Sequence, residues 1–139
     1  MNDFYNHEHY PDPTPYEALR EIRKEQSGRR YMPLVFICSP FSGDTEKNTD
    51  AARRYCRFAV DRGYIPVAPH LIYPQFLDDT KADERQLGMF FGKVLMTKCA
   101  EVWVFGECIS AGMQEEIQYA EKRRLKVRYF TDDYKEVER

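Results

Sequence analysis

The chain of 139 residues contains 42% hydrophobic residues and carries a formal net charge of −2. A chain of this length and composition can bury one hydrophobic core, so we expect one folded domain. The small net charge and its mixed signs give no reason to expect a nucleic-acid partner. No apolar run approaches the roughly 18 residues that a membrane span needs, and no signal peptide is recognisable, so we expect no membrane partner.

The cysteines and the basic residues are both interpreted as structurally ordinary. The four cysteines form no C-x-x-C pair, which favours reduced thiols in a cytoplasmic protein over disulfides or a zinc site. The densest basic cluster lies around the end of a predicted helix, where cations favour the helix dipole, so we interpret it as a solvated face. These residues are Cys38, Cys56, Cys99 and Cys108, and Lys122, Arg123, Arg124, Lys126 and Arg128.

Residues 1–13 are polar and aromatic without any period, which indicates an extended tail. His7 and His9 have no cysteine or carboxylate at a spacing that would complete a metal site, so we expect no metal. Capping and proline signals then predict a helix from Thr14 to about Gly28. Because this helix has few apolar residues, we expect it to dock on the core or on a partner chain.

The rest of the chain alternates unbroken apolar runs, typical of buried parallel strands, with helical periodicities. Pro66 lacks an N–H group, which predicts that the second strand lies at a sheet edge. Five apolar residues of the helix near residue 90 are expected to face the sheet: Leu87, Phe90, Phe91, Val94 and Leu95. The predicted strands are 34–38, 64–68, 101–105 and 126–130, and the predicted helices are about 45–62, 81–98 and 110–124.

This alternation predicts right-handed crossovers and a mostly parallel sheet. We therefore expect an α/β fold with three layers: a flavodoxin- or Rossmann-like sheet of four to five mostly parallel strands, in the order 2-1-3-4, flanked by helices. The expected organisation is a tail and docking helix over residues 1–31, one domain over 32–131 and a charged tail over 132–139.

Loops of small residues follow the first and third predicted strands, at 39–44 and 106–112. The expected strand order makes these strands neighbours, so both loops should face one crevice. Neither loop is a Walker loop or a G-x-G-x-x-G loop. The second loop opens a helix, whose backbone N–H groups and positive end suit an anion. Glu115 and Glu116 lie in the expected first turn of this helix, where acids can simply favour the dipole.

The segment 69–83 connects the second strand to the next helix and is long enough to be a lid or binding loop. His70 within it either contacts a ligand or is a structural histidine. Tyr, Phe and Pro residues over 69–77 exceed what a small core needs, and apolar surface of this kind often marks an interface.

Six segments carry a family resemblance. They are V-F-I-C-S-P-F-S-G-D (35–44), the helix with Asn48, P-H-L (69–71), E-R-Q-L-G-M (84–89), C-A-E-V-W-V-F-G (99–106) and I-S-A-G-M-Q-E-E-I-Q-Y-A (109–120). Together they resemble the nucleoside 2-deoxyribosyltransferase-like superfamily, and most closely an uncharacterised branch found in bacteria and their phages. The resemblance implies cleavage or transfer of the N-glycosidic bond of a nucleoside or nucleoside 5′-monophosphate, without a cofactor.

In this superfamily the nucleophile is a glutamate four residues after the loop glycine, a position that Glu116 occupies here relative to Gly112. A carboxylate there can stabilise an oxocarbenium-like state or form a covalent glycosyl ester. Ser110 stands where the monophosphate hydrolases carry a serine that binds the phosphate. The implied substrate-binding residues are Ser39, Phe41, Ser42, Gly43, His70, Ser110, Gly112 and Met113.

This sequence departs from the characterised enzymes at two positions. Lys93 or its neighbours stand where those enzymes carry an aspartate, and Ser42 stands where the monophosphate hydrolases carry a phosphate-binding arginine. Asp78, Asp79 or Asp83 could protonate the leaving base instead.

These departures leave a second function class open, a nucleotide-binding module of the same fold without turnover. A cytokinin-type phosphoribohydrolase is disfavoured because its P-G-G-x-G-T loop is absent. The superfamily tends to complete its site with a neighbouring subunit, which implies a homo-oligomer whose interface uses the N-terminal helix or residues 69–77.

Overall fold

The computed structural model describes residue 19 and residues 31–139. The predicted N-terminal tail with His7 and His9, and nearly all of the predicted docking helix, lie outside these residues. The chain divides into two compact units, and every element below belongs to Met32–Arg139.

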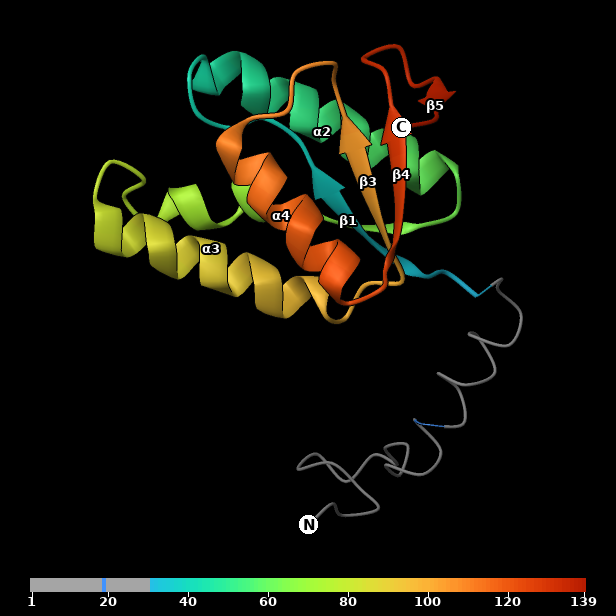
Figure 1. Ribbon diagram of the computed structural model, residues 1–139, viewed down its shortest axis with the longest axis horizontal. Coiled ribbons are helices and arrows are strands. Elements are labelled where there is room, and N and C mark those ends of the chain that lie inside the picture. The colour runs from blue at the N-terminus through green and yellow to red at the C-terminus, as the bar shows by residue number, and fades with distance from the viewer. Residues whose placement is uncertain (1–18, 20–30) are drawn as a thin grey trace, which may run out of the picture. The chain divides into compact units, whose positions relative to one another are not determined.

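Five strands form one sheet in the order β2-β1-β3-β4-β5 (Figure 1). The first four strands are parallel, and β5 pairs with β4 antiparallel, so the sheet is mixed. The predicted mostly parallel α/β sheet with order 2-1-3-4 is confirmed, and Pro66 lies in the edge strand β2 as expected. The strands are β1 Leu34–Cys38, β2 Ile65–Val67, β3 Glu101–Phe105, β4 Lys126–Phe130 and β5 Glu136–Val137.

Helices cover both faces of the sheet and make three layers (Figure 1). Helix α2 (Thr45–Asp61) covers one face, and α3 (Ala82–Met96) and α4 (Ala111–Lys122) cover the other. Short 3-10 turns at Pro69–Leu71 (η1) and Tyr73–Gln75 (η2) connect β2 to α3.

The side chains of β1 alternate between the two faces, as a strand's period of two requires. Val35 and Ile37 pack in the core beneath α2, whereas Phe36 and Cys38 pack in the core beneath α3 and α4. Strand β3 alternates in the same way. The two cores are therefore separate, and the last residue of β1 faces α4.

The prediction for α3 is wrong for three of its five apolar residues, whereas Phe91 and Leu95 are half-buried. Leu87, Phe90 and Val94 are exposed, and the helix meets the core through Gly92 and Met96. A Cβ on Gly92 would lie 3.7 Å from the side chain of Pro69 and 4.0 Å from that of Phe36. Both distances are ordinary van der Waals contacts, so this side of the helix packs against η1 and β1 while Leu87, Phe90 and Val94 lie on the outside.

The C-terminal segment is more ordered than a charged tail. Residues of β5 pair with β4, and the Arg128 guanidinium contacts the Glu136 carboxylate at 2.7 Å and the Glu101 carboxylate at 3.3 Å. Arg128 also lies over the Trp103 ring, 5.2 Å from its centroid. The interpretation of the basic cluster as a solvated face is therefore wrong for Arg128, which is paired with acids of two other strands.

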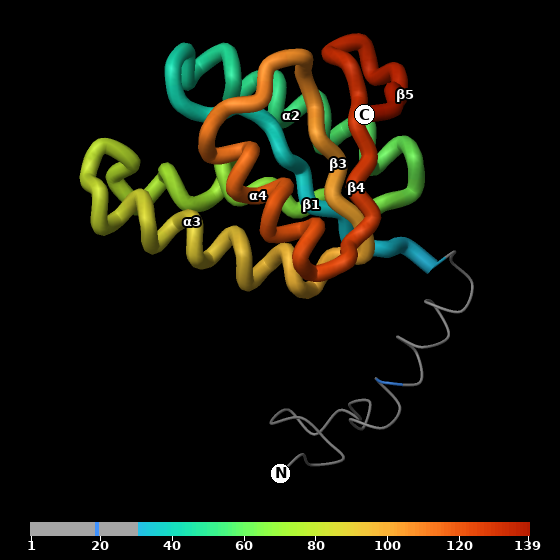
Figure 2. Tube along the Cα trace, viewed as in Figure 1, coloured from blue at the N-terminus to red at the C-terminus, as the bar shows by residue number. Residues whose placement is uncertain are grey.

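All four cysteines are free thiols, with Cys38 and Cys99 buried and Cys108 exposed. Over the residues that the structure describes, no helix has both the length and the apolar character to cross a bilayer. Figure 2 shows that the loops after β1 and β3 lie at the same end of the sheet, as expected for neighbouring parallel strands.

Candidate functional site

Helix α4 begins with Ser110 as its N-cap, whose Oγ accepts a hydrogen bond from the Met113 N–H at 3.2 Å. Because the helix starts at Ala111, Glu115 and Glu116 are its fifth and sixth residues and lie in its second turn. The helix dipole acts mainly on charges in the first turn. The expectation that the two acids lie in the first turn and favour the dipole is therefore wrong, and they need another explanation.

The two neighbouring acids have different surroundings. The Glu115 side chain is 53% exposed and its Oε2 lies 3.5 Å from the Lys93 Nζ on α3. Glu116 is only 5% exposed. Adjacent helical residues project about 100° apart, so one acid reaches the surface while the other points between the helix and the sheet. Glu115 is a surface ion-pair partner, and Glu116 is a buried acid.

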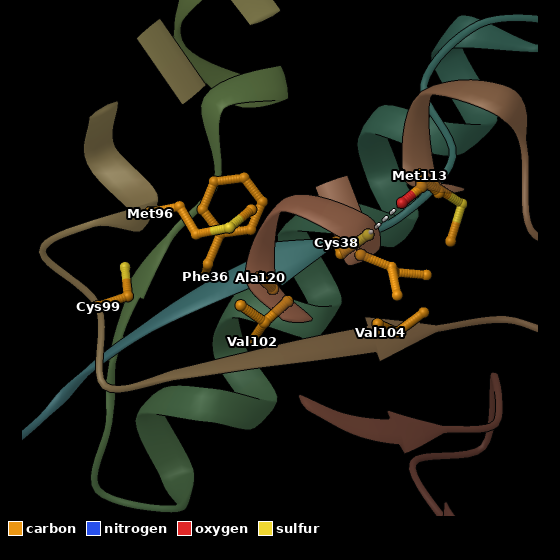
Figure 3. Close-up of a cluster of buried hydrophobic side chains, with 9 residues drawn as sticks. Phe36, Cys38, Met96, Cys99, Val102, Val104, Met113 and Ala120 are labelled. Carbon is orange, nitrogen blue, oxygen red and sulfur yellow. Dashed lines mark hydrogen bonds between the residues drawn. The ribbon is translucent and has the colours of Figure 1, made fainter. Parts of the chain in front are cut away.

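Cys38, at the carboxyl end of β1, is in contact with Glu116. Its thiol donates a hydrogen bond to Glu116 Oε1 at 3.4 Å. The Met113 carbonyl oxygen is a more distant acceptor for the same proton, 3.9 Å from the sulfur (Figure 3). Burial raises the pKa of Glu116 to about 8, while the Cys38 hydrogen bond lowers it, the charge of Glu115 raises it and that of Lys93 lowers it. The carboxyl group is therefore largely protonated at neutral pH.

Two adjoining cavities meet at Glu116. The first, which we call the serine cavity, is lined by hydroxyl groups and the start of α4. The second, which we call the apolar cavity, has a wall in which apolar atoms predominate. Both are lined by Phe41, His70, Asp79, Arg85, Met89 and Glu116. The serine cavity adds Ser39, Ser42, Ser110, Gly112 and Met113, and the apolar cavity adds Pro69, Tyr73, Pro74, Leu77, Glu84, Gly88 and Gly92.

The structure brings eight of the nine site residues expected from the sequence into the serine cavity. The exception is Gly43, which lines neither cavity and has a φ of +99° in the turn before α2. Its role is conformational, because a positive φ strains any residue with a Cβ. Asp44, the next residue, caps α2 by accepting a hydrogen bond from the Lys47 N–H at 3.2 Å.

Ser39 is the least satisfied polar group of the site. It is 2% exposed, and its Oγ has no hydrogen-bond partner among the described residues. Buried hydroxyl groups are normally paired, since an unmade hydrogen bond costs about 1–3 kcal/mol. A hydroxyl of this kind in the wall of a cavity is suited to bind a polar atom of a ligand.

His70 lies between an aromatic ring and a carboxylate. The Phe41 ring stacks on it with centroids 5.1 Å apart and planes 17° apart. Burial lowers the pKa of His70 below its ordinary value, and the nearby charge of Asp79 partly opposes that shift. His70 is therefore a mostly neutral imidazole at neutral pH. Like Asp79, it lines both cavities.

Of the three aspartates considered for the leaving base, only Asp79 lines a cavity together with Glu116. Asp78 accepts hydrogen bonds from the Thr80 N–H at 2.9 Å and from its hydroxyl at 2.6 Å, which tie it into an exposed turn. Asp83 accepts from the Glu84 N–H at 2.9 Å at the start of α3.

Sequence reasoning missed several residues of the site, including Arg85 and Cys38. Arg85 lines both cavities from the first turns of α3, and it belongs to the segment E-R-Q-L-G-M that carried the family resemblance. Cys38 was noted only as a buried thiol. The strand period could have placed it, because every second residue of β1 faces the helix that carries Glu116.

Within Met32–Arg139 and at residue 19, no group of three or more His, Cys, Asp or Glu side chains is arranged to hold a metal ion. The site's charged groups are instead one arginine, one buried glutamate and one aspartate that line both cavities. This set suits an organic ligand that has both anionic and hydrogen-bonding groups.

A family model matches residues 33–130, from just before β1 to the end of β4. The chain belongs to the family Domain of unknown function (DUF7768). The DUF7768 region includes every residue that lines the two cavities, whereas β5 follows it. A comparison with curated proteins found no match. The candidate site is thus a property of the DUF7768 region and not of the segments that flank it.

Proposed function

We propose that this protein cleaves or transfers the N-glycosidic bond of a nucleoside or nucleoside 5′-monophosphate, with Glu116 as the nucleophile. The observation that carries the proposal is the position of Glu116, a buried carboxyl group in the wall shared by a hydroxyl-lined cavity and an apolar cavity. A nucleotide has a matching order of parts, with the sugar between an anionic group and a flat base.

The serine cavity is suited to the 5′ end of such a ligand. Its hydroxyl groups come from Ser39, Ser42 and Ser110, and Gly112 lies in the first turn of α4. A helix N-terminus and nearby hydroxyl groups favour a phosphate. Arg85 in the same wall supplies a positive charge. It can take the place of the phosphate-binding arginine that the monophosphate hydrolases carry at the position of Ser42.

The apolar cavity is suited to the base. Its wall includes Tyr73, Leu77 and Met89, with His70 stacked on Phe41 at its border with the serine cavity. Gly88 and Gly92 add no side chains, so α3 leaves room there. Flat apolar and aromatic walls favour a planar heterocycle, because its faces are poorly hydrated.

In the proposed reaction a carboxylate oxygen of Glu116 forms a bond to the anomeric carbon while the bond from that carbon to the base nitrogen breaks. The electron pair of the broken bond passes to the base nitrogen, which takes up a proton, and Asp79 is the group that we assign to this transfer. Water then attacks the anomeric carbon and gives its proton to the Asp79 carboxylate, while the ester bond between that carbon and Glu116 breaks and releases the Glu116 carboxylate. A second base in place of water gives transfer.

The resemblance to the nucleoside 2-deoxyribosyltransferase-like superfamily supports this proposal, since it places the nucleophile at Glu116. The strand order and a crevice at the carboxyl ends of β1 and β3 support a flavodoxin- or Rossmann-like assignment of the fold. Free thiols at all four cysteines favour a reducing compartment, so we propose a cytoplasmic location, which cell fractionation tests.

A second candidate is a nucleotide-binding module without turnover. It is favoured by the raised pKa of Glu116, about 8, because a neutral carboxyl group is a poor nucleophile but can hydrogen-bond a sugar hydroxyl. Under this proposal Glu116 would bind the sugar and no base would be released.

The test is a screen of nucleosides and 5′-monophosphates for release of free base, followed by comparison of Glu116→Gln with Glu115→Gln. We expect Glu116→Gln to lower turnover roughly 10³-fold or more, because it removes the nucleophile but keeps the shape of the side chain. Glu115→Gln breaks only an exposed ion pair and should leave turnover nearly unchanged.

Near-normal turnover by folded Glu116→Gln would show that the nucleophile assignment is wrong. Tight binding of a nucleotide by the wild type without release of base would instead favour the binding module.

A further inference from the structure

Cys38 is the only residue with a side-chain hydrogen bond to the Glu116 carboxyl group among the described residues. It is completely buried, and its place at the end of β1 in the core beneath α4 leaves it little freedom to move. Oε1 accepts the bond from the thiol at 3.4 Å, whereas Oε2 has no partner within the part of the chain that the structure describes. The two carboxyl oxygens are therefore not equivalent.

We propose that Cys38 is a positioning residue for Glu116: its thiol holds Oε1 and leaves Oε2 for the ligand in the adjoining cavities. The reactive oxygen is thereby selected by the fold and not by the substrate. A catalytic effect of this role rests on the proposed function. The contact between the thiol and the carboxyl group is present whether or not the protein is an enzyme.

The thiol is also suited to remain a hydrogen-bond donor. Burial raises the pKa of Cys38 well above its ordinary value, and the neighbouring Glu116 raises it further through its charge and its hydrogen bond. A thiolate beside a carboxylate in a buried site would be strongly disfavoured. Cys38 therefore keeps its proton over the range in which Glu116 titrates, and it acts as a donor, not as a nucleophile.

Other charged groups face Glu116 from each element around it. Glu115 of α4 raises its pKa and Lys93 of α3 lowers it, and these two are paired with each other at 3.5 Å. Arg85 of α3 and His70 and Asp79 of the connecting segment share its cavity walls. Because Glu115 and Lys93 act in opposite directions, the hydrogen bond from Cys38 is the contact whose removal should be most visible in the titration.

The experiment measures the pKa of Glu116 by carbon-13 NMR of its carboxyl carbon in the full chain, with Glu116→Gln identifying the signal. The test variants are Cys38→Ala, which removes the donor, and Cys38→Ser, which replaces it with a hydroxyl. The matched control is Cys99→Ala, since Cys99 is a buried thiol of the same core cluster whose Sγ lies 3.5 Å from the Leu95 carbonyl.

We expect Cys38→Ala to raise the pKa of Glu116 by about one unit, because the carboxylate loses its direct donor. Cys38→Ser should restore or lower the wild-type value, and Cys99→Ala should leave it unchanged. If a substrate is found, the rising limb of the pH–rate profile should move by the same amount in each variant.

An unchanged or lowered pKa in folded Cys38→Ala, or equal shifts in Cys38→Ala and Cys99→Ala, would overturn the positioning role. If Cys38→Ala fails to fold, a pKa in Cys38→Ser higher than in the wild type would overturn it as well. The titration needs no turnover. A protein that releases no base but shows the expected pKa shift would therefore contradict the proposed enzymatic activity and leave the positioning role of Cys38 standing.

Discussion

Asp78 and Asp79 are neighbours in the chain but make different contacts in the structure. The side chain of Asp78 closes an exposed turn through Thr80, whereas Asp79 lines both cavities and acts on His70 through its charge. Only Asp79 is placed to exchange a proton or a hydrogen bond with a ligand that also meets Glu116. The aspartate that the characterised enzymes carry on a helix is therefore replaced, in our proposal, by one from a connecting segment.

Exchanging each of these aspartates for asparagine separates the two roles. We expect Asp79→Asn to lower release of base roughly 10²- to 10⁴-fold, the usual effect of removing a general acid. Asp78→Asn should stay near the wild-type rate. Asp79→Asn should also lower the pKa of His70, measured by proton NMR, because the charge that raises it is gone. Equal rates for the two variants would show that the leaving base obtains its proton elsewhere.

Helix α3 exposes several of its large apolar residues. The helix packs through Gly92 and Met96, and its Phe90 is 59% exposed. Phe76, in the segment predicted to form an interface, is 65% exposed. Aromatic side chains at this exposure are typical of surfaces that contact another chain. The superfamily resemblance favours a second copy of this chain as that partner.

We expect the protein to sediment as a homo-oligomer at micromolar concentration. Phe76→Glu and Phe90→Glu should each weaken the association, because a charge placed in an apolar interface loses its hydration. Each variant should keep the circular dichroism of the wild type, since both side chains lie outside the cores. A wild-type monomer in analytical ultracentrifugation would contradict the prediction.

At the scale of the whole molecule, the buried acid links stability to pH. Folding raises the pKa of Glu116 from its ordinary 4.5 to about 8, so the native state binds more protons than the unfolded chain between these values. The contribution of Glu116 to the free energy of unfolding should therefore be constant below about pH 4.5. Above that pH the free energy of unfolding should fall as pH rises toward 8. The slope due to one such group is at most about 1.4 kcal/mol per pH unit.

Urea unfolding of the wild type and of Glu116→Gln between pH 6.5 and 8 checks this linkage. The wild type should lose stability relative to the variant as pH rises, because the variant has no proton to lose at this position. The pKa of His70 shifts in the opposite direction, but His70 is present in both proteins, so its contribution cancels in the comparison. Parallel stability curves would show that Glu116 ionises normally in the folded protein.

Local chemistry made much of this fold predictable. Unbroken apolar runs placed β1 and β3, and Pro66 placed an edge strand. These signals depend only on residues a few positions away in the sequence, so they can be recognised without knowledge of the rest of the chain. The expected convergence of the two loops followed from the strand order alone.

Contacts between distant segments were decided only by the tertiary structure. The apolar pattern of α3 did not reveal its buried side, because the helix meets Pro69 and Phe36, which are distant in the chain, on the side of Gly92 and not through Leu87 or Phe90. The pairing of β5 with β4, and the meeting of Arg128 with acids of two other strands, are likewise contacts between different segments.

The site divides in the same way. The family resemblance of the sequence marked Glu116 and seven of the other residues that line the serine cavity, because its motifs are short local segments. It did not distinguish Asp79 from Asp78 or show that Cys38 would reach Glu116, since the thiol and the carboxyl group are 78 residues apart in the chain. Burial, which raises the pKa of Glu116, depends on the packing of α4 against β1 and so could be decided only by the assembled fold.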